Sequence, residues 1–434
     1  MVFAVLVGAG LALAVIVYLY ALVSDPLRDV PGPLLARFTR LWELQRVRGN
    51  HFEQVNWELH AKYGPIVRLA PGRYSINDRT ALKQVFGHAS KFPKAPFYHA
   101  FGHPDPLQAD MFSELDINRH GAKRRKVASL YSMTALLSYE QFVDRCNATL
   151  CSRLRGFADR PLHVPSWRQY YAFDVIGEIT VGEPFGMMDR PECPDPRGIL
   201  QAIHDSMVYG SRMGLFSELH PWLGRVTSAF GIKIPFDTVM SLIREQIAKR
   251  RADKTSAHRA DFLDKLLRMQ EDNKVSELDI ITTIGANIAA GSDTTAISLS
   301  SIVYNLLTHP EYARKLQAEL DDLSSTGQMG DPVTFQQAQQ MPYLQAVIKE
   351  ALRVHPAVGQ PLSRIVPPGG AEIAGRYFPA GSSIGVNPWV LHRNPDVFGD
   401  DADAFRPERW LDEDREKVLS MDQAIFTVRA RALP

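Results

Sequence analysis

The sequence predicts a mainly α-helical (α+β) fold with a small β-rich part, placed behind an N-terminal helix that spans a membrane. Three observations lead to this fold class. The chain begins with a long apolar stretch without charge, over residues 2–23. A capped helical pattern runs from Ser276 to Leu307. Short extended stretches bounded by glycine and proline occur early in the chain and predict strands.

The N-terminal stretch has the length and composition of a membrane anchor. From Val2 to Val23 it holds about 22 uncharged residues, or ~33 Å of helix, enough to cross a hydrocarbon core of ~30 Å. It lacks the basic start and short apolar core of a cleaved signal peptide. Arginines begin only at Arg28, so the positive-inside bias leaves the rest of the chain in the cytosol. We expect a single-pass anchor (residues 1–23) and a linker (24–33) ending in the stiff Pro31-Gly32-Pro33 hinge.

The composition of the rest is that of an ordinary globular domain. The chain has 434 residues, of which 45% are hydrophobic and 22% charged, with a net charge of +1. This balance gives enough apolar surface for a core and no sign of a nucleic-acid partner. The chain contains only 3 cysteines, which predict no disulfide framework and fit a reducing compartment. No repeat or second shift in composition divides the head, so we expect one domain.

Local patterns place several elements in this head domain. Residues 66–69 and 74–76 read as strands of a small sheet. The long helix begins at Ser276, where Asp279 completes a capping box, and ends before His309-Pro310. A second helix starts either after Thr334 or just beyond Met341.

The middle of the long helix is unusual. There the chain reads Ala289-Ala290-Gly291-Ser292-Asp293-Thr294-Thr295, where glycine alone costs about 1 kcal/mol relative to alanine. Two interpretations are open: a functional one, with close approach of a ligand or a local opening of the helical hydrogen bonds, and a helix-packing notch whose polar residues face solvent.

In combination, ordered motifs identify a resemblance. The hinge and the notch are followed by Glu350-Ala351-Leu352-Arg353 and then by Phe405-Arg406-Pro407-Glu408-Arg409-Trp410. Their order and separation resemble the cytochrome P-450 family, over the chain up to about Thr427. The segment around His392-Arg393-Asn394-Pro395 is most similar to microsomal fungal members related to pisatin demethylase. The resemblance implies the helical cytochrome P-450 fold, with its small β-rich subdomain, for residues 34–427.

The resemblance also implies roles for individual residues. On the long helix, Asp293 would relay protons and Thr294 would hold the bound oxygen or its water, while Gly291 would leave room for the oxygen. Proton transfer of this kind needs a polar group in an otherwise dry site.

Two further sets of residues take roles from the family. Glu350, Arg353 and Arg409 match a buried charge triad that holds the proximal side of the fold together. His120, Arg124 and Arg364 match positions that bind the propionates of a haem, and arginine suits a carboxylate because it can bind it through two N–H groups.

The function implied is that of a haem-thiolate monooxygenase. Such an enzyme contains haem (heme b) and inserts one atom of O₂ into a hydrophobic small molecule, here in secondary metabolism. The implied electron source is NADPH, through NADPH-cytochrome P-450 reductase at the endoplasmic reticulum membrane, with the head domain cytosolic. Segments 95–106 and 207–216 would border the substrate pocket, through Phe97, Tyr98, Phe101, Met213 and Phe216.

One departure from the family bears directly on this function. The family carries a loop of the form Phe-x-x-Gly-x-Arg-x-Cys-x-Gly, whose cysteine thiolate ligates the iron. Here Ala424-Ile425-Phe426-Thr427 is followed by residues 428–434, which contain no cysteine. Cys146, Cys151 and Cys193 do not occupy the expected place, so we assign no metal ligand and predict no haem binding through a cysteine. The alternatives are an error in the gene model, such as an unspliced intron or frameshift, and a haem-free truncated pseudoenzyme or membrane scaffold.

Overall fold

The computed structural model describes residues 15, 16, 18, 20, 25–87, 90–157, 161–190, 195–232, 234–253 and 260–432. The predicted anchor over residues 2–23 lies almost entirely outside this described part, as does Cys193. Among the helices that are described, none combines the length and the apolar character needed to cross a membrane.

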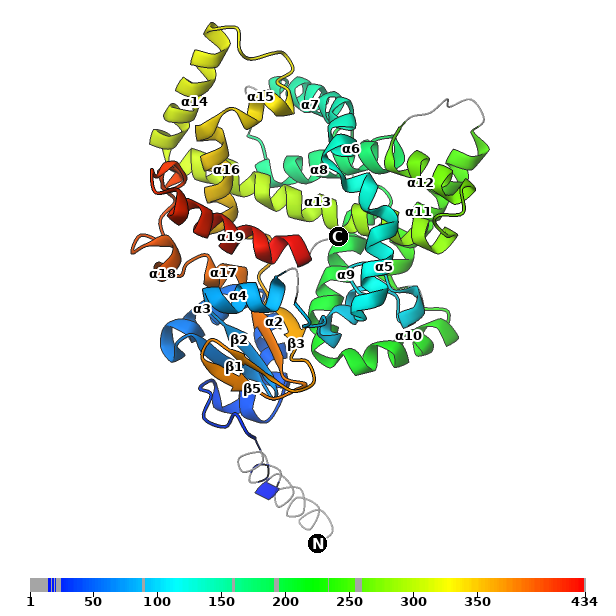
Figure 1. Ribbon diagram of the computed structural model, residues 1–434. Coiled ribbons are helices and arrows are strands. Elements are labelled where there is room, and N and C mark those ends of the chain that lie inside the picture. The colour runs from blue at the N-terminus through cyan, green and yellow to red at the C-terminus, as the bar shows by residue number, and fades with distance from the viewer. Residues whose placement is uncertain are drawn as a thin grey trace.

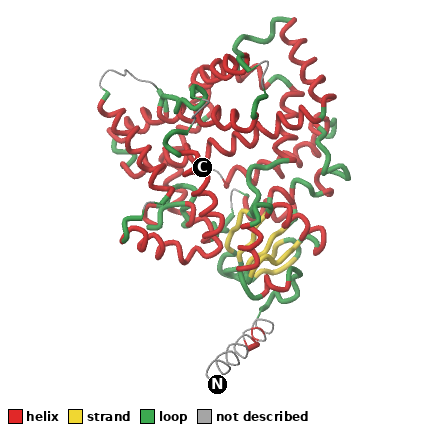
Figure 2. Tube along the Cα trace, turned by 180° about the vertical axis from the view of Figure 1, so that it is seen from behind, coloured by secondary structure: helices red, strands yellow, loops and turns green. Residues whose placement is uncertain are grey.

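Helices form most of the molecule, and a small sheet lies at one end of it (Figures 1 and 2). The mainly helical class with a small β part is therefore confirmed. The α-helices in chain order are α2 (Leu41–Arg48), α3 (Phe52–Tyr63), α4 (Arg79–Phe86), α5 (Ile117–Val127), α6 (Met133–Ser138), α7 (Glu140–Arg155), α8 (Val164–Val181), α9 (Ile199–Met213), α10 (His220–Ala229), α11 (Pro235–Ala252), α12 (Phe262–Glu271), α13 (Glu277–Thr308), α14 (Pro310–Ser325), α15 (Phe335–Gln339), α16 (Pro342–Val354), α17 (Pro388–Leu391), α18 (Pro395–Phe398) and α19 (Arg415–Ala432). Short 3₁₀-helices occur at Leu34–Arg37, Pro96–Phe101, Pro106–Gln108, Ala128–Tyr131, Gly214–Leu219 and Pro407–Leu411.

The sheet joins the two ends of the head domain. Its four strands lie in the order β1 (Ile66–Ala70), β2 (Arg73–Ile76), β6 (Ser383–Val386) and β3 (Leu362–Ile365). The β1–β2 and β3–β6 pairs are antiparallel, whereas β2 and β6 are parallel. A separate two-stranded sheet consists of β4 (Ala371–Ile373) and β5 (Arg376–Phe378). Both strands predicted from the sequence are confirmed.

The long helix α13 has 32 residues and crosses the centre of the molecule (Figure 1). Its predicted start is confirmed, because Ser276 and Asp279 form a reciprocal capping box. Ile280, Ile284 and Ile288 recur every four residues and are fully buried, which gives the helix one apolar stripe. For the following region, both expected starts are used, since Thr334 caps α15 and Pro342 opens α16.

A buried polar network holds the sheet against the helices around it. His60 of α3 donates from Nδ1 to the Gly64 carbonyl (2.9 Å), and its Nε2 lies 2.8 Å from the Ser75 hydroxyl on β2. Asn56 accepts from Ser75 (3.1 Å) and from the Asn387 amide (2.9 Å), which begins α17. The network therefore ties α3, β2 and α17 together.

The His60 ring makes stability depend on pH. Burial lowers the pKa of His60 from 6.5 to about 4, so the unfolded chain binds the proton first as the pH falls. Stability is then fully present above pH 6.5 and is lost as the pH falls towards 4. We expect this group to remove about 2–3 kcal/mol between neutral pH and roughly pH 4.5. Urea unfolding should show the advantage of wild type over His60→Gln shrinking by that amount, whereas the exposed control His51→Gln behaves as wild type. An advantage that does not change with pH would contradict this assignment.

Candidate functional site

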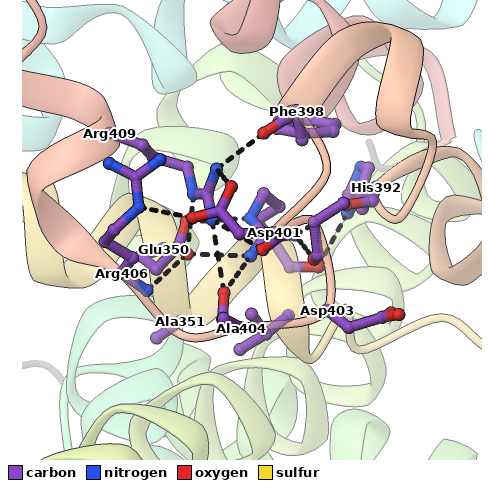
Figure 3. Close-up of polar contacts among 12 residues, drawn as sticks. Glu350, Ala351, His392, Phe398, Asp401, Asp403, Ala404, Arg406 and Arg409 are labelled. Carbon is purple, nitrogen blue, oxygen red and sulfur yellow. Dashed lines mark hydrogen bonds and ion pairs between the residues drawn. The ribbon is translucent and has the colours of Figure 1, made fainter.

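The Glu350 carboxylate binds two arginines in the protein interior (Figure 3). Arg353 donates to both of its oxygens at 2.8 Å, and Arg409 donates from Nε at 2.9 Å. The three side chains are at most 2% exposed. The structure thus brings the three residues of the expected triad into direct contact.

The remaining donors and acceptors of this triad also find partners. Glu350 accepts from the Trp410 indole (3.0 Å), and the arginines donate to backbone carbonyls of His392 (2.8 Å) and Phe398 (2.7 Å). Such complete pairing is what makes buried charges tolerable in a protein interior. The triad therefore ties α16 to the loops between α17 and α19, which is a structural role.

A second set of charges converges without neutralising one another. Arg364 on β3 is buried and donates to the Tyr98 hydroxyl (3.0 Å). Lys94 lies beside it on the neighbouring segment and donates to the carbonyls of Met111 and Phe112, both at 2.7 Å. His120, half-buried on α5, completes the set with Arg124, which is exposed. We call Lys94, His120, Arg124 and Arg364 the basic cluster.

Burial and the neighbouring positive charges act together on the pKa of two members of the cluster. Burial, followed by repulsion from Arg364, lowers the pKa of Lys94 to about 7. Burial together with Lys94, Arg124 and Arg364 lowers the pKa of His120 to about 4. The carboxylates Asp110 and Glu114 oppose the shift of Lys94 only in part, and Glu114 already binds Arg119 and Lys123. A bound dianion would relieve this repulsion.

Sequence reasoning found three members of the basic cluster and missed Lys94. In the sequence, Lys94 follows Lys91 in a loop rich in proline, which is typical of a solvated segment. Two backbone hydrogen bonds, from Ala95 to Ser363 (3.2 Å) and from Ile365 to Pro93 (2.9 Å), bring this loop against β3. Because these partners lie far apart in the chain, no local signal could have found Lys94.

The polar notch of α13 divides its side chains among different partners. The Thr294 hydroxyl donates to the Ala290 carbonyl (2.7 Å), whereas Asp293 accepts from the Gln169 amide of α8 (2.6 Å). Gly291 lies against α8, where a Cβ would come within 2.8 Å of Ile176. The glycine is thus required for close packing of the two helices. Its expected part in leaving room for oxygen stays a prediction.

Burial raises the pKa of Asp293, and the hydrogen bond from Gln169 offsets part of that rise. The carboxyl is therefore one that can hold a proton more readily than an exposed aspartate. Of the two interpretations of the notch, packing accounts for Gly291, while solvent exposure does not describe the partly buried Asp293.

A cavity of about 350 Å³ extends along α13 from Glu277 to Ala289. Its walls are mostly apolar and include Phe101, Met207 and Phe236. Of the five aromatic and methionine side chains expected at a pocket, only Phe101 lines this cavity. Tyr98 instead packs in the core, where it binds Arg364.

These features agree with what comparison with known proteins finds. The sequence model of the family cytochrome P-450 matches residues 31–425. The chain is 42% identical to a pisatin demethylase of Fusarium vanettenii over 91% of this chain and 78% of that protein. It is 34% identical to a cytochrome P-450 monooxygenase of Aspergillus terreus, over 96% of this chain and 88% of that protein. The chain therefore belongs to the cytochrome P-450 family, which is a family of oxidoreductases.

The family implies a haem. The described residues offer partners for its two carboxylates but not for its iron. The like charges of the basic cluster suit the two carboxylates that a haem carries. For the iron the described residues offer no thiolate: Cys146 is buried against Trp167, and burial raises its pKa to about 12, while Cys151 is exposed on the same helix. Nor does the described part of the chain contain another cluster of three or more metal-ligating side chains.

Removal of the Glu350 charge should unfold the protein readily. Glu350→Gln leaves the guanidinium groups of Arg353 and Arg409 buried beside a neutral amide, and breaking a buried pair costs about 3–5 kcal/mol. Urea unfolding should show this loss, whereas Arg197→Ala, which removes an exposed pair with Glu245, should cost no more than ~1 kcal/mol. A loss in Glu350→Gln as small as that of the control would contradict the structural role.

Proposed function

We propose that this protein is a haem-dependent monooxygenase that inserts one atom of O₂ into a hydrophobic small molecule of secondary metabolism. The observation that carries the proposal is the basic cluster, where backbone pairing brings Lys94 beside the buried Arg364, and where burial together with the neighbouring cations lowers the pKa of Lys94 to about 7 and that of His120 to about 4. A dianionic ligand is the simplest partner for such an arrangement. Membership of the family supports haem as that ligand.

The chain's own residues would act at three places. Arg364, His120 and Arg124 would bind the haem propionates, with Lys94 as a fourth donor. Thr294, whose hydroxyl donates to the Ala290 carbonyl, would hold a water at the oxygen site by accepting a hydrogen bond from it, and Asp293 would relay protons there. When bound through a thiolate, the haem supplies the iron that activates O₂.

The cavity along α13 supports a hydrophobic substrate. Its walls combine Phe101, Met207 and Phe236 with small residues of the helix, Gly285 and Ala289. An apolar molecule placed there would lie one residue from Ala290 and about one and a half turns of helix from Thr294. Burial of apolar surface would supply most of its binding free energy.

Electron supply and location follow from the family and the sequence. We propose that NADPH-cytochrome P-450 reductase delivers the electrons and that residues 1–23 anchor the protein in the endoplasmic reticulum membrane. The head domain would then face the cytosol, where the reductase and NADPH are available. The uncharged residues 2–23 and the arginines that follow support this arrangement.

A second candidate is a haem-free module that keeps the fold for interaction. The observation in its favour is that the described cysteines, Cys146 and Cys151, lie together on α7 and provide no thiolate for iron. In this case the basic cluster would bind a different anion or none. The two candidates differ in haem binding and in the ligand of the iron.

Haem titration tests the part played by the basic cluster. Arg124→Gln should weaken haem binding about fivefold, which corresponds to about 1 kcal/mol for an exposed charge pair. Arg125→Gln changes the next exposed residue of the same helix and should leave affinity unchanged. Arg364→Gln should weaken binding tenfold or more, because this arginine is buried.

A modified haem provides the control for unfolding. The dimethyl ester of haem has no carboxylate, so Arg124→Gln and Arg364→Gln should bind it as wild type does. Equal losses with the ester and with free haem would show that the substitutions act on the fold and would contradict propionate binding.

The reduced carbon-monoxide difference spectrum tests whether a cysteine of this chain ligates the iron. We expect the 434-residue chain loaded with haem to lack the band of a thiolate-ligated iron, because none of its cysteines occupies the place where the family's ligand is expected. A thiolate band that disappears when one cysteine is replaced by serine would overturn this expectation and favour the monooxygenase.

A further inference from the structure

One hydrogen bond connects the acid of the polar notch to a neighbouring helix. The Gln169 amide, in the second turn of α8, donates to the Asp293 carboxyl at 2.6 Å. Both side chains are partly buried. In the described part of the chain this is the only side-chain hydrogen bond of Asp293. The family motif lies on α13 alone and therefore does not include Gln169, which lies on α8.

The bond determines where the acid is held. Asp293 and Thr294 are consecutive residues, so their side chains leave α13 about 100° apart. The Thr294 hydroxyl donates to the Ala290 carbonyl (2.7 Å), whereas the Asp293 carboxyl accepts from Gln169 of α8. The two groups that the proposed proton path needs are thus held apart by separate partners. Gln169 is the partner that holds the acid.

The chemical nature of glutamine matters for proton exchange. An amide N–H can donate to a carboxylate and to the carbonyl oxygen of a neutral carboxylic acid alike. A lysine or arginine in its place would strongly favour the carboxylate and keep the proton off. His204 of α9 acts electrostatically on Asp293, and its charged form also favours the carboxylate.

We propose that Gln169 is a positioning residue for Asp293. Its amide holds the carboxyl on the side of α8 and, because it is uncharged, leaves the carboxyl free to take up and release a proton. The purpose of this arrangement rests on the proposed function, in which the proton serves oxygen chemistry. The control of Asp293 by Gln169 is a property of the chain itself.

The competing explanation is a hydrogen bond that only joins two helices. The structure contains such a bond for comparison: Tyr131 donates to Asn287 of α13 at 2.6 Å. Tyr131→Phe removes one partly buried interhelical hydrogen bond of the same length without touching Asp293. It is therefore the matched control for the loss of Gln169.

Infrared titration of the Asp293 carboxyl tests the proposal on the 434-residue chain without haem. The band of the protonated acid is identified by its loss in Asp293→Asn. In Gln169→Met, which keeps the shape but removes the donor, the midpoint should rise by about one pH unit, a tenfold change in acid dissociation. In Gln169→Lys the midpoint should fall by a similar amount, and in Tyr131→Phe it should stay at the wild-type value.

The outcomes separate this proposal from the proposed function. A midpoint in Gln169→Met equal to that of Tyr131→Phe overturns the positioning role, whatever the haem experiments show. Shifts in the two expected directions support it even if the chain binds no haem. In that event the haem titration would contradict the proposed oxygen chemistry, while the infrared titration would still support the positioning role.

Discussion

The carboxylate of Glu350 is the point on which the proximal part of the fold depends. It neutralises Arg353 and Arg409, and these arginines in turn donate to the backbone carbonyls of His392 and Phe398. A buried charge is costly, and the cost is offset only when every donor has an acceptor. The loops between α17 and α19 therefore take one conformation, because any other would leave a buried guanidinium unpaired.

The basic cluster illustrates the opposite use of charge. In the triad, opposite charges meet and the result is stability. In the cluster, Lys94 and Arg364 are brought side by side by backbone hydrogen bonds, and the fold bears their repulsion. Repulsion kept in a folded protein is typical of a ligand site, where perturbed pKa values gather. The contrast separates the structural role of the triad from the binding role that we propose for the basic cluster.

Much of the architecture could be predicted from local patterns. The capping box at Ser276 and the Pro310 that follows α13 set the limits of the longest helix, since both act within a few residues. The strands on either side of Gly72 follow from their alternation with turn residues. Glu350 and Arg353 lie three residues apart on one helix, so their contact is also a local property.

The tertiary structure decided what lies across from these elements. Gln169, Lys94 and Ile176 have no signal in the sequence, because each acts on a residue far away in the chain. The role of Gly291 also depends on a distant segment. Only the position of α8 shows that a side chain at residue 291 would collide with Ile176. The sequence by itself determined the long helix α13, the starts of α15 and α16, the first two strands and the chemical types at the site. Their partners were decided by packing, because contacts between distant segments depend on how the whole chain closes.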